Sequence, residues 1–209
     1  MRINTGTFLR GSGMTPTEAA RRAQIIEATI DTVAELGYGK ASFARIVERA
    51  GLSSTRMISY HFAGKEDLML ATMGAVVDAC DRFLEERLPA DADRAAMLRA
   101  RIEAEAAFVG AHPRAARALI EIGTHGRTED GASLSELVSR DVRVGRLQRL
   151  LLQGQREGAF GEFDAEVMAM TIRHALDGVA LRRTREPGLD VEAYGRELAG
   201  LFDRATRPG

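Results

Sequence analysis

Apolar residues recur every three or four positions along most of the chain, and no run alternates with period two for long. Recurrence of this kind marks one face of an α-helix, whereas alternation marks a half-buried strand. The segment from Thr15 to Gly37 is typical, because Ile26, Ile30 and Val33 follow its start at helical spacing. The pattern predicts an all-α fold of about nine helices.

Capping residues mark where several helices begin and end. Thr15 starts a Thr-Pro-Thr-Glu sequence, which is the pattern of a capping box with proline in the first turn. Ser42 and Ser53 stand where they can cap two short helices, and Gly51 between them supplies the left-handed residue that closes the first. A fourth helix is expected to begin at Lys65. Five further helices are expected over about 93–110, 113–125, 133–157 and 164–185 and from about Val191 onward.

These elements divide the chain into three expected parts. Residues 1–18 are expected to form a flexible tail, in which either Met1 or Met14 is the true start. Residues 19–80 are expected to form a helix-turn-helix domain of three helices, and residues 81–209 a larger helical bundle.

Composition narrows the class of protein. The chain has 209 residues, 45% of them hydrophobic and 28% charged, as in globular proteins. Its single cysteine, Cys80, excludes an intramolecular disulfide and fits a reducing compartment. The N-terminal segment lacks the apolar core of a secretory signal, and no apolar run is long enough to span a bilayer. We therefore expect a cytoplasmic protein without membrane association.

The charge distribution limits how a polyanion could be bound. Net charge is −1, and residues 1–70 hold 9 Lys or Arg against 7 Asp or Glu, a balance of +2. If the protein binds nucleic acid, a few well-placed Lys or Arg side chains must make the contacts, because the surface has no large excess of positive charge. An architectural protein that coats DNA non-specifically is disfavoured for the same reason.

The segment after Gly51 gathers short hydroxyl groups and one arginine on a helix-turn-helix. Such a unit presents its second helix to the DNA major groove. Met57, Ile58 and Phe62 can anchor it inward, while Arg56 can make bidentate bonds to guanine. Free N–H groups at helix starts suit phosphates. The residues expected to contact double-stranded DNA are Ser42, Arg45, Ser53, Ser54, Thr55, Arg56, Ser59, Tyr60, His61 and Lys65. The alternative is a structural helix pair with a solvated face.

The chain from Glu18 to about Cys80 resembles the N-terminal DNA-binding domain of the TetR family of transcriptional regulators. The matching pieces are "IIEATIDTVAELGYGKAS", "FARIVERAGLS" and "YHFAGKEDL". The resemblance implies a ligand-responsive regulator, most often a repressor, that binds a near-palindromic operator as a homodimer.

One departure from the family pattern lies in the recognition helix. The interval from Gly51 to Phe62 is one residue longer than is usual in the family, which displaces the position that usually presents an aromatic group to DNA. By count that position is Ile58 or Ser59, and the sequence leaves open whether Ser59 or Tyr60 faces the groove.

The resemblance also implies a ligand-binding and dimerisation body after residue 81. The helix over about 164–185 is apolar nearly all round in its middle, so it needs a second partner besides its own core. With the last helix it predicts a two-fold four-helix interface. Its expected residues are Ala175, Gly178, Val179, Tyr194, Leu198 and Phe202. The alternative is an enclosed central helix in a monomer.

An unknown small-molecule effector is expected in this body. Candidate pocket residues are apolar or polar groups on helices that surround the cavity in the family: Met73, Phe83, Met97, Phe108, Glu121, His125, Gln153 and His174. Each is equally suited to a core or surface position.

Catalysis, metals and cofactors find little support in the sequence. His112, His125 and His174 follow no metal-ligand spacing, and Cys80 lies among apolar residues as an inert thiol would. No glycine-rich phosphate loop follows a strand pattern. We expect no catalytic residue, metal site or cofactor. The rival class is a helical-bundle binding protein or enzyme whose helix-turn-helix does not read DNA.

Overall fold

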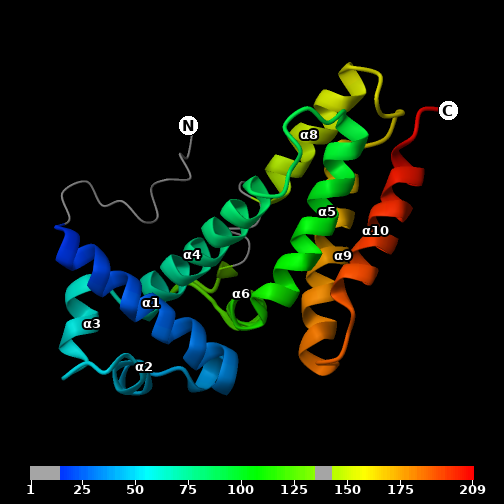
Figure 1. Ribbon diagram of the computed structural model, residues 1–209. Coiled ribbons are helices and arrows are strands. Elements are labelled where there is room, and N and C mark those ends of the chain that lie inside the picture. Colours follow the sequence, from blue (N-terminus) through cyan, green and yellow to red (C-terminus); the bar gives the residue numbers. More distant parts are fainter. Residues whose placement is uncertain (1–14, 135–142) are drawn as a thin grey trace. The chain divides into compact units, whose positions relative to one another are not determined.

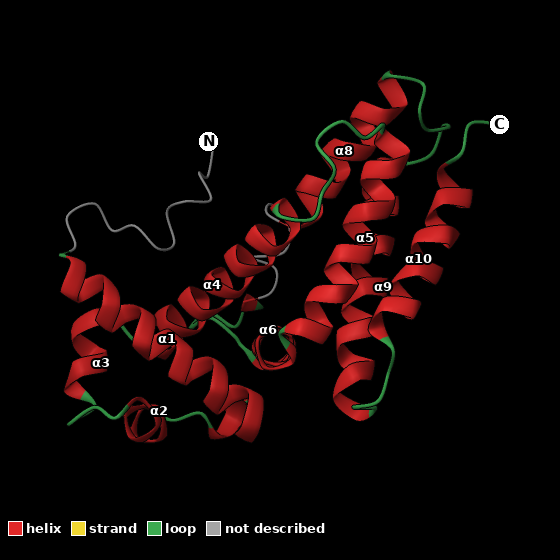
Figure 2. Cartoon of the chain, viewed as in Figure 1, coloured by secondary structure: helices red, strands yellow, loops and turns green. Residues whose placement is uncertain are grey.

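The computed structural model describes residues 15–134 and 143–209, and its regular structure in these ranges is helical apart from one isolated bridge between Arg127 and Ser133. Figure 2 shows helices joined by loops. This confirms the all-α prediction. The first fourteen residues of the expected tail lie outside the described residues.

Nine α-helices and one 3-10 helix lie within the described ranges (Figure 1). In chain order they are α1 (Pro16–Leu36), η1 (Tyr38–Lys40), α2 (Phe43–Ala50), α3 (Arg56–His61), α4 (Lys65–Glu85), α5 (Arg94–Ala111), α6 (Pro113–His125), α8 (Gly145–Arg156), α9 (Ala165–Arg185) and α10 (Val191–Thr206). The helix expected over 133–157 corresponds to α8, and part of the expected range, 135–142, lies outside the described residues. None of the described helices is both long enough and apolar enough to span a bilayer.

The described residues form two compact units. The first takes in those of Met1–Asp78 and Arg114–Val138, and the second those of Ala79–Pro113 and Ser139–Gly209. The first unit therefore adds α6, except its first residue, to the helices expected in the helix-turn-helix domain.

The start and end of α1 follow from its capping residues. The Thr15 hydroxyl accepts a hydrogen bond from the Glu18 amide (3.3 Å), and the Glu18 carboxylate accepts one from the Thr15 amide (2.7 Å), so the predicted capping box is confirmed. These bonds lower the pKa of Glu18. Gly37 ends the helix at φ 81° and ψ 161°, a conformation that strains residues with a Cβ.

Each unit has its own apolar core. In the first unit the largest fully buried side chains are Ile25, Ile46, Ile58, Leu68, Met69, Ile122 and Leu134. In the second unit they come from α4, α5 and α8: Leu84, Leu98, Ile102, Leu147 and Leu151. Helix α10 packs closely on α5 because Gly195 faces Ala106, whose Cβ would lie only 2.6 Å from a Cβ at residue 195.

A buried ionic network crosses the core of the second unit. Glu105 on α5 pairs with Arg173 on α9, and the two side chains are almost fully buried. Arg101 lies 3.2 Å from Glu105. Arg173 and Arg143 each lie 3.1 Å from Asp177. Burial alone would raise the pKa of Glu105, but the neighbouring arginines, Arg173 foremost, lower it to about 2.

Removal of one partner from this network should destabilise the fold strongly. Arg173→Met leaves the Glu105 charge buried without its main partner, so we expect a loss of about 3–5 kcal/mol in the free energy of unfolding. Urea denaturation at neutral pH measures this loss. The double variant Glu105→Leu/Arg173→Met removes both charges and should recover a large part of it. A single variant as stable as the wild type would contradict the assignment.

The same carboxylate should make stability depend on pH. The pKa of a glutamate is about 4.3 in an unfolded chain and is held at about 2 here by the buried arginines. A lowered folded-state pKa contributes stability that is complete above about pH 4.3 and is lost as the pH falls toward 2. Thermal unfolding across this window should show a steeper decline for the wild type than for the Glu105→Leu/Arg173→Met variant.

Candidate nucleic-acid interface

Helix α2 is fixed at both ends by residues that the sequence singled out. Ser42 caps its start, with the hydroxyl accepting from the Arg45 amide at 3.4 Å. Gly51 closes it in the left-handed region, at φ 64° and ψ 31°. Gln24 of α1 donates to the Ala50 carbonyl (2.7 Å), which ties the end of α2 to α1. The predicted cap and the predicted left-handed glycine are confirmed.

The turn after Gly51 is longer than the capping pattern predicted. Helix α3 begins at Arg56 and has six residues, so the expectation that Ser53 caps it is wrong. The backbone first turns through Ser54 and Thr55, whose carbonyls accept from the amides of residues 57 and 58 at 3.2 and 3.0 Å. The Ser53 hydroxyl lies 3.6 Å from the Met57 sulfur instead.

Helix α3 is anchored to α1 through its apolar side. Ile58 and Phe62 are buried, as expected. The guanidinium of Arg22 on α1 lies 4.1 Å from the centroid of the Phe62 ring and donates to the His61 carbonyl at 2.6 Å. A cation over an aromatic face is attracted by the ring, and the hydrogen bond satisfies a carbonyl at the helix end. Together these contacts fix which face of α3 points outward.

The outward face of α3 carries Arg56, Ser59 and Tyr60. Arg56 is exposed and has no hydrogen bond or ion pair with the described part of the chain. Tyr60 is 73% exposed, and its hydroxyl lies 3.3 Å from a Glu18 carboxylate oxygen. The burial of Ile58 removes that residue from the exposed face. Ser59 and Tyr60 are both exposed, and both stay candidates for the groove.

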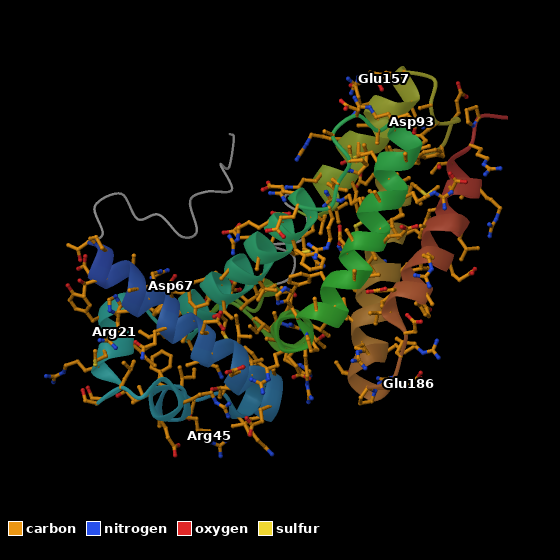
Figure 3. All side chains as sticks on the ribbon, in the orientation of Figure 1. Arg21, Arg45, Asp67, Asp93, Glu157 and Glu186 are labelled. Atoms are coloured by element: carbon orange, nitrogen blue, oxygen red, sulfur yellow. The ribbon has the colours of Figure 1, made fainter. Side chains whose placement is uncertain are left out.

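The start of α2 is held by η1 and by Lys65. The Lys40 carbonyl accepts from the Ser42 amide (3.0 Å) and from the Arg45 guanidinium (3.1 Å). Lys65 donates to the Tyr38 carbonyl at 3.3 Å, and its ammonium lies 4.4 Å from the centroid of the Tyr38 ring. Burial lowers the pKa of Lys65. Arg45 lies at the α2 end of the unit, where side chains extend outward (Figure 3).

The expected ligand-contact residues do not gather in one unit. Met73, Glu121 and His125 lie in the first unit, whereas Phe83, Met97, Phe108, Gln153 and His174 lie in the second. In the second, the rings of Phe83 and Phe108 are in edge contact with centroids 5.5 Å apart.

The expected dimer residues differ in exposure. Val179 and Phe202 are buried in the core of the second unit, Ala175, Tyr194 and Leu198 are half-buried, and Gly178 is exposed. On these two helices the structure leaves four large apolar side chains exposed that were not among the expected interface residues, namely Val167, Met170 and Leu181 on α9 and Leu201 on α10. The three residues on α9 are separated by three and by eleven positions in the sequence. This spacing places them on one stripe of a helix and was the signal that could have identified them.

No group of histidine, cysteine or acidic residues in the described ranges is arranged to hold a metal. Cys80 is half-buried, and burial, followed by the charge of Glu105, raises the pKa of its thiol to about 12. A thiol with so high a pKa is a poor nucleophile at neutral pH.

Comparison with known proteins connects this geometry to a family. The family model described as "Bacterial regulatory proteins, tetR family" matches residues 25–72, which run from α1 to the first turns of α4. The HTH-type transcriptional regulator BetI of Pseudomonas paraeruginosa is 40% identical over 93 residues. These are 44% of this chain and 45% of BetI, so the match spans a little under half of that relative.

Two further matches cover most of the chain. BetI of Vibrio campbellii is 28% identical over 187 residues, which are 82% of this chain and 85% of the relative. FadR from Bacillus subtilis, solved in complex with stearoyl-CoA, has a similar fold with a TM-score of 0.73 and 20% identity, over 86% of this chain and 96% of FadR. All three proteins are named as transcriptional regulators and not as enzymes, in line with the expectation from sequence. These matches show that residues 25–72 resemble the tetR family of bacterial regulatory proteins and that the chain over most of its length is similar to transcriptional regulators.

Proposed function

We propose that this protein regulates transcription, as a repressor, by binding a near-palindromic DNA operator as a homodimer that a small molecule releases. The observation that carries the proposal is the outward face of α3. Arg56 is exposed there and has no partner among residues 15–134 and 143–209, on a helix anchored by Ile58 and Phe62 in the segment that matches the family. A free guanidinium on such a helix suits bidentate bonding to guanine.

The other residues of the interface divide by the kind of contact they suit. Ser54, Thr55, Ser59 and Tyr60 have short or planar polar groups near the start and face of α3, where base edges would lie. Phosphate oxygens suit the capped start of α2 at Ser42 and the cations Arg45 and Lys65. The hydroxyl of Ser53 and the imidazole of His61 are proposed as further donors to phosphate. Lys65 also bonds the Tyr38 carbonyl, so we propose that it combines a phosphate contact with a structural role.

A homodimer is supported by the apolar stripe on the outside of α9. Val167 is 62%, Met170 36% and Leu181 41% exposed. Gly178, in the same stripe, has open space where a side chain would be, which would let a partner helix approach closely. Leu201 on α10 is 53% exposed. We therefore move the proposed interface from the buried Val179 and Phe202 to this stripe, with Gly178, Ala175, Tyr194 and Leu198 beside it.

The two-fold symmetry of the proposed dimer determines the arrangement of the half-sites in the operator. An isologous dimer presents two copies of α3 related by the symmetry axis. The half-sites are then inverted and separated by about one helical turn of DNA or a little more. A regulator of this kind acts in the cytoplasm, which is the location we propose.

The effector is proposed to be a small molecule that binds the second unit. FadR, which shares the fold, was solved in complex with stearoyl-CoA, so a protein of this fold can bind a small molecule. In this chain the candidate contacts are Phe83, Met97, Phe108, Gln153 and His174. An effector must bind the free protein and its DNA complex with different affinity in order to release the operator.

Selection of the fragments that the protein binds from a random DNA pool tests whether it recognises a DNA sequence and whether Arg56 contacts a base. The wild type should enrich an inverted repeat. Arg56→Ala should relax the preference at one symmetric pair of positions and weaken binding by about 1–3 kcal/mol, because one bidentate base contact is lost. Enrichment of no sequence by the wild type would refute DNA reading, and unchanged preference in the variant would remove Arg56 from the base edge.

Light scattering of the purified chain tests the interface. Two carboxylates placed on the stripe, in Met170→Glu/Leu181→Glu, should convert a dimer to a monomer, because charges buried without partners disfavour association. The matched control is Leu152→Glu on α8, since Leu152 and Met170 are both 36% exposed. Leu152 lies outside the stripe, so this control should stay dimeric. A wild type that is monomeric at all accessible concentrations would contradict the proposal.

A further inference from the structure

Glu121 on α6 lies against the corner that joins α1 to α2. One of its carboxylate oxygens is 3.4 Å from the Tyr38 amide, which donates a hydrogen bond to it. The same oxygen would lie 3.4 Å from a Cβ at Gly37. The glycine, at φ 81°, thus both turns the chain and leaves room for the carboxylate. Residues 83 positions apart in sequence are thereby brought together at the end of α1.

The corner held by Glu121 also fixes the start of α2. Tyr38 opens η1, and its carbonyl accepts from the Ala41 amide at 3.3 Å and from Lys65 at 3.3 Å. The last residue of η1, Lys40, accepts from both the amide of Ser42 and the guanidinium of Arg45. A displacement of Tyr38 is therefore passed through a three-residue helix to two side chains proposed to contact phosphate.

The contact of Glu121 with η1 differs from a contact that α6 makes with α1. Arg114 at the start of α6 pairs with Asp31 at 3.1 Å, and the Arg114 side chain is largely exposed. That ion pair joins the two helices but does not touch η1. Glu121 is only half-buried, and a ring nitrogen of His125, one turn later on α6, lies 3.7 Å from its carboxylate. The carboxylate is thus held between its own helix and the backbone of Tyr38.

We propose that Glu121 is a positioning residue for DNA binding, which acts by holding Tyr38 and, through η1, the start of α2. The proposal rests on the proposed function, and it gives Glu121 a role other than the ligand contact expected from sequence. Because Glu121 lies on α6, any shift of α6 relative to α1 reaches the phosphate-facing end of α2 through this bond.

Three variants separate positioning from general stability, with affinity measured on the DNA fragment that the wild type selects, at one fixed salt concentration. Glu121→Ala should bind about tenfold more weakly with little change in melting temperature. Glu121→Gln should restore most of the affinity, because its amide oxygen accepts the same bond. Arg114→Ala should lose less than about threefold, because an exposed ion pair contributes little.

Two results would overturn the proposal: wild-type affinity in Glu121→Ala, or an equal loss in Arg114→Ala. If the wild type itself selects no DNA, the proposed function fails and the role of Glu121 is decided by amide hydrogen exchange. Faster exchange confined to residues 38–45 in Glu121→Ala would then support the positioning of η1 and α2. Unchanged exchange there would refute it.

Discussion

The contact between Arg22 and the end of α3 determines what the first unit can present. The guanidinium covers the Phe62 ring and bonds the His61 carbonyl, so a helix of only six residues is held by more than its own turns. So short a helix has little stability alone, because nucleating a helix costs more than its first bonds return. With Ile58 and Phe62 fixed inward, Arg56 and Tyr60 have no alternative but to face outward.

The second unit satisfies a different constraint. Its core includes the Glu105–Arg173 pair, and charges of this kind are tolerated in an interior only when their partners are well placed. Helix α9 therefore has one side committed to an ionic network and apolar packing, while Val167, Met170 and Leu181 remain outside. This division explains why a helix that is apolar nearly all round leaves only one apolar stripe exposed.

Capping residues in the sequence predicted most of the helix starts and ends correctly. The predictions that were wrong concern features that depend on contacts between residues far apart in the sequence. Thr15, Ser42 and Gly51 act through bonds to residues within four or five positions, which a sequence displays directly. The prediction that Ser53 caps α3 was wrong because the helix begins only at Arg56, after a turn through Ser54 and Thr55. Which faces of α9 and α10 are buried depends on the helices that pack against them, so periodicity alone could not separate the buried Val179 and Phe202 from the exposed residues. The bond between Glu121 and Tyr38 has no sequence signal at all.

The surroundings of Cys80 have a practical consequence. It is the single cysteine of the chain, and its half-buried thiol has a pKa raised to about 12. A maleimide reacts with the thiolate form of cysteine, so we expect Cys80 to react only slowly at neutral pH. A second cysteine introduced at an exposed position, such as Ser54, would take up a fluorophore selectively without replacement of Cys80. A fluorophore at that position would report on the turn before α3 with little background from Cys80.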